Sequence, residues 1–309
     1  TYEEIAARGG GILNSAKRML AAGEEELFEA AWARLEEMKS MGTGAVEIKS
    51  GYGLSYEGEL KMLRVIRKLK EKSSLTIKAT FLGAHAYPEQ YQSNHEPYIR
   101  LLIEDLLPRI AQDGLADFID VFCEQGYFSV DETSRILEAG NKYGLQPKVH
   151  VNQFNVLGGV KASVLAGARS VDHLELIHQE DVEALLKSRT IPVALPGCSL
   201  FLKIPYTPAR QLIDAGLPLA LATDYNPGSA PSGNMNLVNA LACIQMQMTP
   251  EEVMNASTIN GAYAMDVQQH IGSITVGKNA NLLLTKPIPS LATLPYSFGS
   301  NLVERNFTA

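Results

Sequence analysis

The chain has 309 residues, of which 46% are hydrophobic and 20% charged, a mixture that supports a globular protein with a large core. Its net charge of −7 and the lack of any run rich in lysine or arginine argue against a nucleic-acid partner. The sequence shows no apolar run long enough to cross a membrane, and its start lacks the pattern of a signal peptide. Three scattered cysteines indicate reduced thiols in the core and a cytoplasmic location: Cys123, Cys198 and Cys243.

Seven short apolar or β-branched segments alternate with amphipathic segments along the chain. We predict strands at residues 45–51, 75–86, 117–124, 147–154, 170–176, 191–197 and 218–224. Helical patterns follow these strands, most clearly at 56–72, 96–114 and 129–144. Ser129 is a candidate N-cap for the last of these helices, and Gly144 is a candidate stop. We expect a long loop after the sixth strand.

Strands that alternate with helices predict a parallel sheet with right-handed crossovers. Seven units fit either an open doubly wound sheet or a (β/α)8 TIM barrel from which the first strand is missing. The barrel is favoured because polar residues follow nearly every strand, and in a barrel all these strand ends meet at one mouth. The polar residues at the strand ends are Lys49, Tyr52, His85, Glu124, His150, Gln153, His173 and Asp224.

The domain organisation predicted from this pattern has two parts. Residues 1–268 form the α/β barrel, incomplete on its amino-terminal side, and residues 269–309 form part of a small β-sandwich-like appendage. Residues 272–285 have β character around a Gly-Lys turn. Their apolar and polar residues alternate, unlike those of a barrel strand buried on both faces, and the segment is too long for another barrel unit. We expect the partner strands of this segment to come from the amino-terminal side.

The six histidines divide into two groups. His95, His178 and His270 lie in loops or at helix starts, where we expect surface or capping roles. The other three, His85, His150 and His173, end predicted strands and therefore face the barrel mouth.

His150 and Asp224 are the candidate metal ligands. An imidazole in the barrel mouth can bind a divalent metal, although for His150 alone a buried side chain bonded to backbone is the better interpretation. Asp224 ends an apolar strand, where a carboxylate is costly unless it is paired or coordinated. A helix N-cap and an ion pair are the alternatives for Asp224. No basic residue lies near it in the sequence, so metal binding and general-base catalysis are favoured.

His173 and His85 are candidates for polarising a carbonyl group and orienting a substrate. Asp172 and Glu175 flank His173, and we expect at least one of them to orient the ring. Together with a metal, these residues predict metal-assisted hydrolysis in which Asp224 accepts a proton and His173 stabilises an oxyanion. Two protein ligands are fewer than the three that a catalytic zinc normally has.

The order of two strand-end histidines and one strand-end aspartate resembles the amidohydrolase superfamily. Within it, four stretches taken together resemble the imidazolonepropionase family: EIKSGYGL (47–54), FLGAHAYP (81–88), HVNQFNVLGG (150–159) and ATDYNPGS (222–229). The resemblance covers essentially the whole chain. It implies hydrolysis of the ring C–N bond of 4-imidazolone-5-propanoate to N-formimidoyl-L-glutamate in histidine degradation, with one divalent metal ion, zinc or iron.

The resemblance also implies roles for individual residues. His150 and Asp224 would bind the metal, and His173 and Asp224 would be catalytic. The substrate contacts would come from Tyr52, His85, Gln153, Asn226, Gly228 and Ser229. The partner is then a small molecule rather than a nucleic acid or a membrane, and a homodimer is compatible with the family but not established by the sequence.

The sequence departs from the family pattern in two places. It has no HxH pair, which supplies the family's other two metal ligands, and it lacks the early arginine for the substrate carboxylate. Asn152 and Gln153 replace acidic residues, so proton transfer falls to Asp224 and His173. The stretch VFCEQG has no lysine to bridge two metals, which fits a one-metal site. Two alternatives stay open: a related deaminase or cyclic amidase, and a truncated barrel that is inactive or poorly soluble alone.

Overall fold

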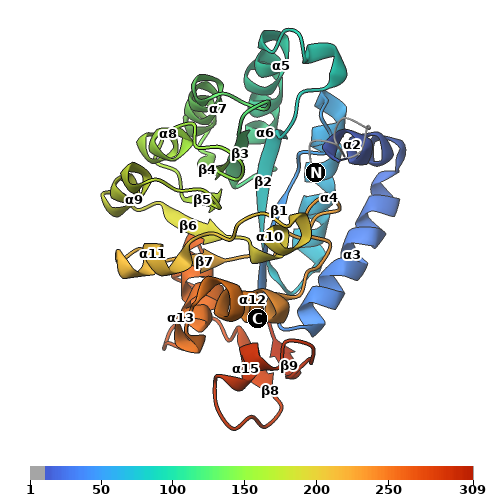
Figure 1. Cartoon of the computed structure of the whole chain (residues 1–309). Coiled ribbons are helices and arrows are strands. Elements are labelled where there is room, and N and C mark those ends of the chain that lie inside the picture. Colours follow the sequence, from blue (N-terminus) through green and yellow to red (C-terminus); the bar gives the residue numbers. More distant parts are fainter. Residues whose placement is uncertain (1–10, 309) are drawn as a thin grey trace.

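A curled sheet of seven parallel strands forms the centre of the computed structural model, which describes residues 11–308 (Figure 1). The spatial order of the strands is their order along the chain, β1 to β7. Their bounds are β1 (Ala45–Lys49), β2 (Thr76–Ala84), β3 (Phe118–Cys123), β4 (Gln146–Val151), β5 (Ser170–His173), β6 (Ile191–Ala194) and β7 (Ala220–Leu221). All seven predicted strands are present, and the α/β barrel class is confirmed as a curled half-barrel. Within the described residues, β1 and β7 are the two edges of this sheet.

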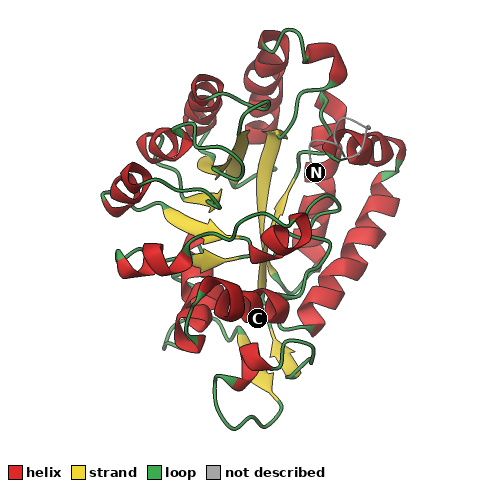
Figure 2. Ribbon diagram, in the orientation of Figure 1, coloured by secondary structure: helices red, strands yellow, loops and turns green. Residues whose placement is uncertain are grey.

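Helices cover the outside of the sheet (Figure 2). The first half of the chain contributes α2 (Ile12–Ala21), α3 (Glu24–Ser40), α4 (Tyr56–Lys72), α5 (Glu96–Arg100), α6 (Leu107–Asp113), α7 (Val130–Lys142) and α8 (Gly159–Leu165). The second half contributes α9 (Gln179–Leu186), α10 (Pro196–Leu202), α11 (Ala209–Asp214), α12 (Met235–Met246), α13 (Pro250–Asn255), α14 (Gly261–Ala264) and α15 (Thr293–Tyr296). A short 3₁₀-helix lies at η1 (Glu89–Tyr91), and short π-helices, which have wider turns, lie at η2 (Leu101–Leu106) and η3 (Ala256–Asn260).

The ends of α7 show how local sequence sets the helix boundaries. The Ser129 hydroxyl accepts a hydrogen bond from the backbone N–H of Glu132 at 3.3 Å, and the Glu132 carboxylate accepts one from the Ser129 N–H at 2.8 Å. This reciprocal capping box satisfies N–H groups that have no partner inside the helix. At the other end, Gly144 follows the helix with a φ of 77°, a left-handed conformation that favours glycine. The cap and the stop were both predicted.

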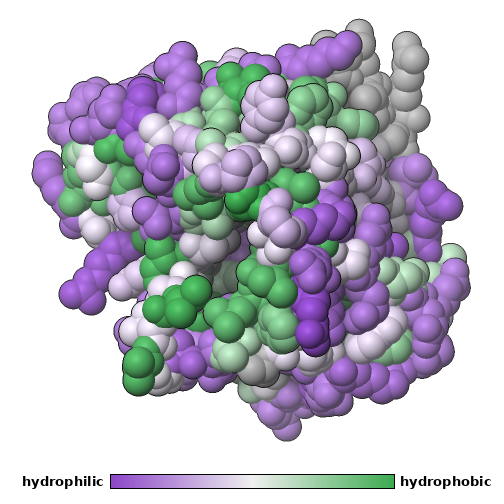
Figure 3. Space-filling view, turned by 90° about the horizontal axis from the view of Figure 1, so that it is seen from below, coloured by the Kyte–Doolittle hydropathy of each residue, from purple (hydrophilic) through white to green (hydrophobic). Residues whose placement is uncertain are grey.

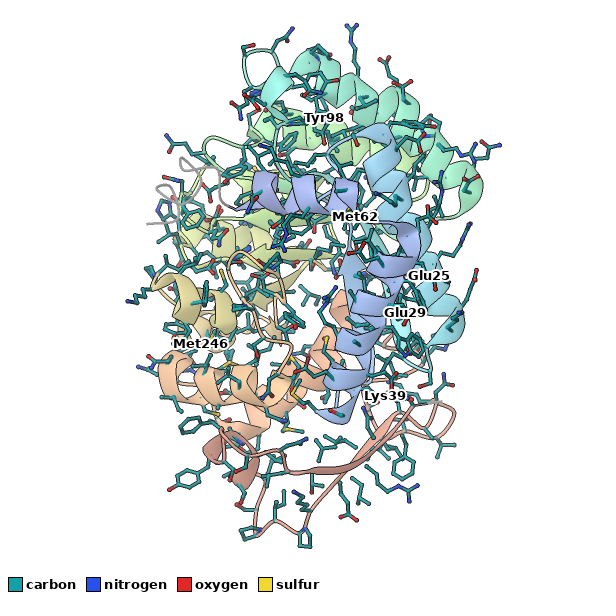
Figure 4. The ribbon with its side chains drawn as sticks, turned by 90° about the vertical axis from the view of Figure 1, so that its right-hand side faces the viewer. Glu25, Glu29, Lys39, Met62, Tyr98 and Met246 are labelled. Carbon is teal, nitrogen blue, oxygen red and sulfur yellow. The ribbon has the colours of Figure 1, made fainter. Side chains whose placement is uncertain are left out.

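The main apolar core lies between the sheet and the covering helices. Tyr98 and Leu102 are fully buried there, and the Tyr98 hydroxyl donates a hydrogen bond to the Gly83 carbonyl at 2.8 Å. Figure 4 shows Tyr98 at the top of this layer, and Glu25 and Glu29 on α3, where the Glu25 carboxylate pairs with Lys68 of α4. The core therefore fixes the strands from outside and leaves their carboxyl ends free to carry polar groups.

Two predicted helix boundaries need correction. Residues 196–202 form α10 rather than a long loop, because Pro196 suits the first turn of a helix, where an N–H is not needed. The predicted helix 96–114 is interrupted by the wider turn η2, which ends just before Pro108. Proline cannot donate to the preceding turn, so the regular hydrogen-bond ladder is broken there.

The β segment near the carboxyl terminus also differs from its prediction. Only residues 282–285 form a strand, β8 (Leu282–Thr285), which pairs antiparallel with β9 (Val303–Phe307). β9 thus supplies one partner of β8 from the carboxyl-terminal side, and further strands from the amino-terminal side stay a prediction. Three leucines of β8 are exposed, and Figure 3 shows apolar side chains gathered in the middle of the face seen from below.

Among the helices of residues 11–308, none combines the length and the apolar character that a membrane crossing requires.

Candidate active site

The predicted site residues come together at the carboxyl ends of the strands. The rings of Tyr52 and His85 lie 5.2 Å apart between centroids, those of His85 and His150 6.4 Å, and those of His150 and His173 5.4 Å. Burial raises the pKa of Tyr52 above its usual value, and the nearby charge of Asp224 raises it further. Residues from β1, β2, β4, β5 and β7 therefore form one continuous cluster, as expected for a barrel mouth.

Several of these residues have an unusual backbone conformation. Asn152, His173 and Asp224 have φ values of 58°, 89° and 53°, in the left-handed region that side chains other than glycine rarely adopt. Such conformations cost about 1 to 3 kcal/mol each and persist where the surrounding structure enforces them, often at functional sites. Each of the three ends a strand or follows one closely, at the mouth of the sheet.

His150 has the arrangement that protein metal ligands commonly show. Its Nδ1–H donates to Oδ1 of Asp120 at 3.0 Å, which leaves Nε2 as the ring nitrogen that can bind a metal. The Asp224 carboxylate accepts a hydrogen bond from the Ser229 hydroxyl at 3.2 Å, and within residues 11–308 it forms no ion pair with lysine or arginine. An imidazole nitrogen and a carboxylate suit zinc, iron or manganese, so these two residues fit a divalent metal.

A network of buried charges lies behind His150. The Lys49 ammonium pairs with Asp120 at 2.8 Å, with Asp172 at 3.4 Å and with Glu47 at 2.5 Å, and Lys148 also pairs with Glu47. Burial opposes ionisation of Asp120, but His150 and Lys49 together hold the pKa of its carboxyl well below the usual range. Asp120, His150 and Asp172 are close enough to bind a metal, but Lys49 already supplies the positive charge there.

Glu47 links the stability of this network to acid pH. Burial alone would raise the pKa of its carboxyl, but Lys148 and Lys49 outweigh burial and lower the pKa from 4.5 to about 2. The ionised carboxylate therefore stabilises the fold above its unfolded pKa, and this contribution is lost as the pH falls toward 2. We expect the urea midpoint of the protein to fall more steeply between about pH 5 and about pH 3 than that of Glu47→Gln. Equal slopes for the two proteins would contradict this assignment.

His173 is held by two neighbours. Its Nδ1 lies 3.2 Å from Oε1 of Glu175, and a side-chain hydrogen bond joins it to Cys198. Burial would lower the pKa of His173, but the Glu175 carboxylate and Cys198 outweigh burial and raise the pKa well above its usual value. The expected orienting contact is thus made by Glu175, while Asp172 accepts from Ser170 instead.

His85 is oriented differently. Its Nδ1 lies 3.0 Å from the Gly51 carbonyl, which makes Nδ1–H the donor and leaves Nε2 as an acceptor. Burial and the neighbouring His150 lower the pKa of His85 from 6.5 to about 4. The ring is therefore neutral at neutral pH and can accept a hydrogen bond from a ligand N–H group.

The loop after Asp224 is organised by Asn226. Its Oδ1 accepts from the backbone N–H groups of Gly228 and Ser229, each at 2.8 Å, and its Nδ2 donates to the Asp224 carbonyl at 2.6 Å. These bonds form a tight turn that holds the left-handed backbone of Asp224 in place. The structure thus places Asn226, Gly228 and Ser229 beside Asp224, and their contacts with a substrate stay a prediction.

Three buried carboxylates that the sequence did not single out for this purpose hold the other loops of the mouth. Glu124 accepts from the backbone N–H of Phe154 at 2.9 Å, and Asp181 accepts from the Asn152 side chain at 3.2 Å. Glu59, at the start of α4, accepts from Gly51, Gly53 and Leu54 around Tyr52, at 2.7 to 3.1 Å. For Glu59 the sequence does hold a signal, which is a carboxylate in the first turn of a helix directly after a glycine-rich loop. The sequence has no comparable signal for Glu124 and Asp181.

Replacing Glu59 with glutamine should loosen the Tyr52 loop. The amide keeps one acceptor oxygen, but its NH2 group faces backbone N–H donors, so we expect a loss of about 1 to 3 kcal/mol in the free energy of unfolding and a raised KM. Urea denaturation and steady-state kinetics measure the two effects. Glu57→Gln is the matched control, because Glu57 lies on the same helical turn but is exposed. Equal stability of the two variants would argue against this role of Glu59.

The comparisons with known proteins agree with this geometry. Residues 3–295 match the model of the amidohydrolase family. The fold is similar to that of an adenosine deaminase from Xanthomonas campestris with bound zinc, with a TM-score of 0.73 and 17% identity over 94% of this chain and 70% of that one. That likeness concerns the fold alone. By the family model, the chain is therefore an amidohydrolase, and its parallel half-barrel with a polar mouth fits this class.

Curated relatives narrow the class further. An imidazolonepropionase of Flavobacterium johnsoniae is 64% identical over 98% of this chain and 74% of its own length. An imidazolonepropionase of Alkaliphilus oremlandii is 45% identical over 98% of this chain and 72% of its own length. The chain belongs to the imidazolonepropionase family, which confirms the resemblance found in the sequence.

Proposed function

We propose that this chain carries the site that hydrolyses the ring C–N bond of 4-imidazolone-5-propanoate to N-formimidoyl-L-glutamate in histidine degradation. The observation that carries the proposal is the convergence of Tyr52, His85, His150, His173 and Asp224 at one end of the sheet. The 64% identity to the Flavobacterium johnsoniae imidazolonepropionase supports the choice of substrate over that of other amidohydrolases.

In this proposal His150 and Asp224 hold one divalent metal ion, zinc or iron. A bound divalent metal would supply Lewis acidity, which lowers the pKa of water toward neutral pH. Asp224 accepts the proton from the attacking water and passes it to the leaving ring nitrogen. His173 carries a proton at neutral pH because its pKa is raised, so it donates a hydrogen bond to the oxygen on which negative charge develops.

The remaining residues bind the ring. The Tyr52 hydroxyl stays protonated because its pKa is raised, so it can donate a hydrogen bond to the substrate. His85 offers an acceptor nitrogen to a ring N–H, and the Gln153 amide offers a donor and an acceptor but cannot take a proton. Proton transfer therefore depends on Asp224 and His173.

A second part of the proposal concerns completion of the site. β1 and β7 are edge strands among the described residues, and two protein ligands are fewer than a catalytic zinc usually has. We infer that a further strand carrying the family's HxH pair lies between these edges in the active enzyme. Without that strand, we expect the chain to bind metal weakly and to be inactive or poorly soluble.

The test compares the chain alone with the chain joined to a family segment that carries the HxH pair. Ring opening of 4-imidazolone-5-propanoate, deamination of guanine and cytosine, and elemental analysis of bound metal are measured on both. We expect ring opening, and metal bound through His150 and Asp224, for the joined form only. Faster deamination of either base would overturn the substrate assignment, and tight stoichiometric zinc that the chain alone keeps in a Cys198→Ser background would overturn the inference about the missing ligands.

A further inference from the structure

A second group of metal-binding side chains lies beside the proposed catalytic residues. His173 at the end of β5, Glu175 two residues later and Cys198 on α10 are all buried, and their donor atoms lie within 4.8 Å of one another. We propose that these three residues form a second site for a thiolate-binding divalent ion such as zinc, separate from the site of His150 and Asp224. A nitrogen, an oxygen and a sulfur donor form a set that zinc accepts.

The carboxylate of Glu175 supports this proposal independently. Its side chain is fully buried, and its Oε2 has no hydrogen-bond partner among residues 11–308. The ion pair that the described structure gives it is with His173, which bonds the other oxygen, Oε1. A buried carboxylate oxygen without a partner loses the hydration it would have in water, and a cation at this point would replace that hydration.

The group of Asp120, His150 and Asp172 differs from the group around Glu175 in the source of its positive charge. Asp120 and Asp172 also lie beside a histidine, but the Lys49 ammonium sits 2.8 Å and 3.4 Å from them and balances their charge. No lysine or arginine is paired with Glu175 in the described part of the chain. The charge beside Glu175 is a proton on His173, which a metal ion can displace, whereas the Lys49 side chain stays in place.

The spacing of His173 and Glu175 suits a tetrahedral ion, and the Cys198 sulfur lies within 4.8 Å of both donor atoms. Ligand atoms bonded to zinc at about 2.0 to 2.3 Å are about 3.3 to 3.6 Å apart from one another. Nδ1 of His173 and Oε1 of Glu175 are 3.2 Å apart, close to this spacing, and Cys198 is already hydrogen bonded to His173. The Gln153 amide donates to the Cys198 sulfur at 3.3 Å and would stabilise a negatively charged thiolate.

Binding of the ion releases two protons. The ion forms a bond to the Cys198 sulfur as the S–H bond breaks, and it binds a His173 nitrogen as the N–H bond at that nitrogen breaks; both protons leave to solvent. His173 can then no longer donate a proton or a hydrogen bond from that atom. This consequence rests on the proposed function: zinc in excess of the catalytic ion should inhibit the enzyme.

Cobalt provides the test, because a cobalt–thiolate bond gives a charge-transfer absorption band in the near ultraviolet and the site of His150 and Asp224 contains no sulfur. We expect Co²⁺ titration of the full chain to produce this band. Cys198→Ser should abolish it, and Glu175→Gln should weaken cobalt binding at least about tenfold. Cys243→Ser is the matched control and should keep the band, since Cys243 lies on α12, away from this group.

Two outcomes would overturn the proposal: no thiolate band in the unmodified chain, or a band that survives in Cys198→Ser. If Cys198→Ser fails to fold, as judged by circular dichroism, Glu175→Gln decides, and unchanged cobalt affinity in that variant counts against the site. Inhibition of ring opening by excess zinc is measured separately on the joined, active form. A protein that shows the cobalt band but no ring opening would contradict the proposed function and leave the metal site standing.

Discussion

Replacing Asp224 with asparagine is expected to lower kcat for ring opening by about 10²- to 10⁴-fold. The amide has a similar shape, but it cannot accept the proton from water, and it is a much weaker metal ligand. The metal content should fall together with kcat. Steady-state kinetics and elemental analysis of the active, joined form measure both effects.

Asp266→Asn is the matched control for this substitution. Asp224 and Asp266 have nearly the same left-handed backbone, with φ values of 53° and 54°, and asparagine tolerates that conformation. Asp266 pairs with Arg169 at a partly exposed position outside the mouth. The Asp266 variant should therefore keep its activity. A kcat for Asp224→Asn within a few-fold of the Asp266 variant would remove Asp224 from the mechanism.

The second large effect is expected at Asp120, where asparagine should lower the free energy of unfolding by about 1 to 3 kcal/mol. The substitution removes the 2.8 Å partner of the partly buried Lys49 ammonium, which keeps Glu47 and Asp172, and it weakens the hydrogen bond that orients His150. Urea denaturation measures the loss of stability. Metal affinity should fall roughly 10- to 100-fold, because the carboxylate behind a histidine ligand increases the basicity of the ring.

Asp117→Asn serves as the control for Asp120. Asp117 precedes β3, is partly exposed, and pairs with Lys70 and Lys78 at 3.2 and 3.3 Å. Ion pairs of this kind contribute little, so we expect a loss of about 1 kcal/mol or less and unchanged metal affinity. If Asp117→Asn and Asp120→Asn were equally stable, the buried network would not be the source of the effect.

The strands and their order could be predicted because apolar runs that alternate with amphipathic segments are typical of a buried parallel sheet covered by helices. β7 differs most from its prediction, because the apolar run 218–224 predicts a longer strand than the two residues that pair with β6; β5 and β6 each end three residues before their predicted ends. Backbone pairing depends on the neighbour as well as on the run itself, and β6 offers partners only at Val193 and Ala194.

The site was predictable only in part. His150, His173 and Asp224 could be found because each is a polar residue at the end of an apolar segment. Lys49 and Asp120 are 71 positions apart, and their contact arises from the curl and register of three parallel strands, which no local pattern records. Cys198 was assigned to the core by its residue type, and its burial is correct, but its contact with His173 requires the position of α10.

The left-handed backbone at His173 sets stability against activity. A glycine at that position would adopt the φ of 89° without strain and relieve about 1 to 3 kcal/mol, but it would remove the imidazole. Glycine would also leave the buried Glu175 carboxylate without its ion pair. Random mutagenesis that selects only for thermal resistance should therefore accept glycine at position 173 only together with a neutral residue at position 175, whereas selection for growth on the substrate should retain histidine. The same trade-off makes the mouth of this barrel a poor target for consensus stabilisation and its outer helices a better one.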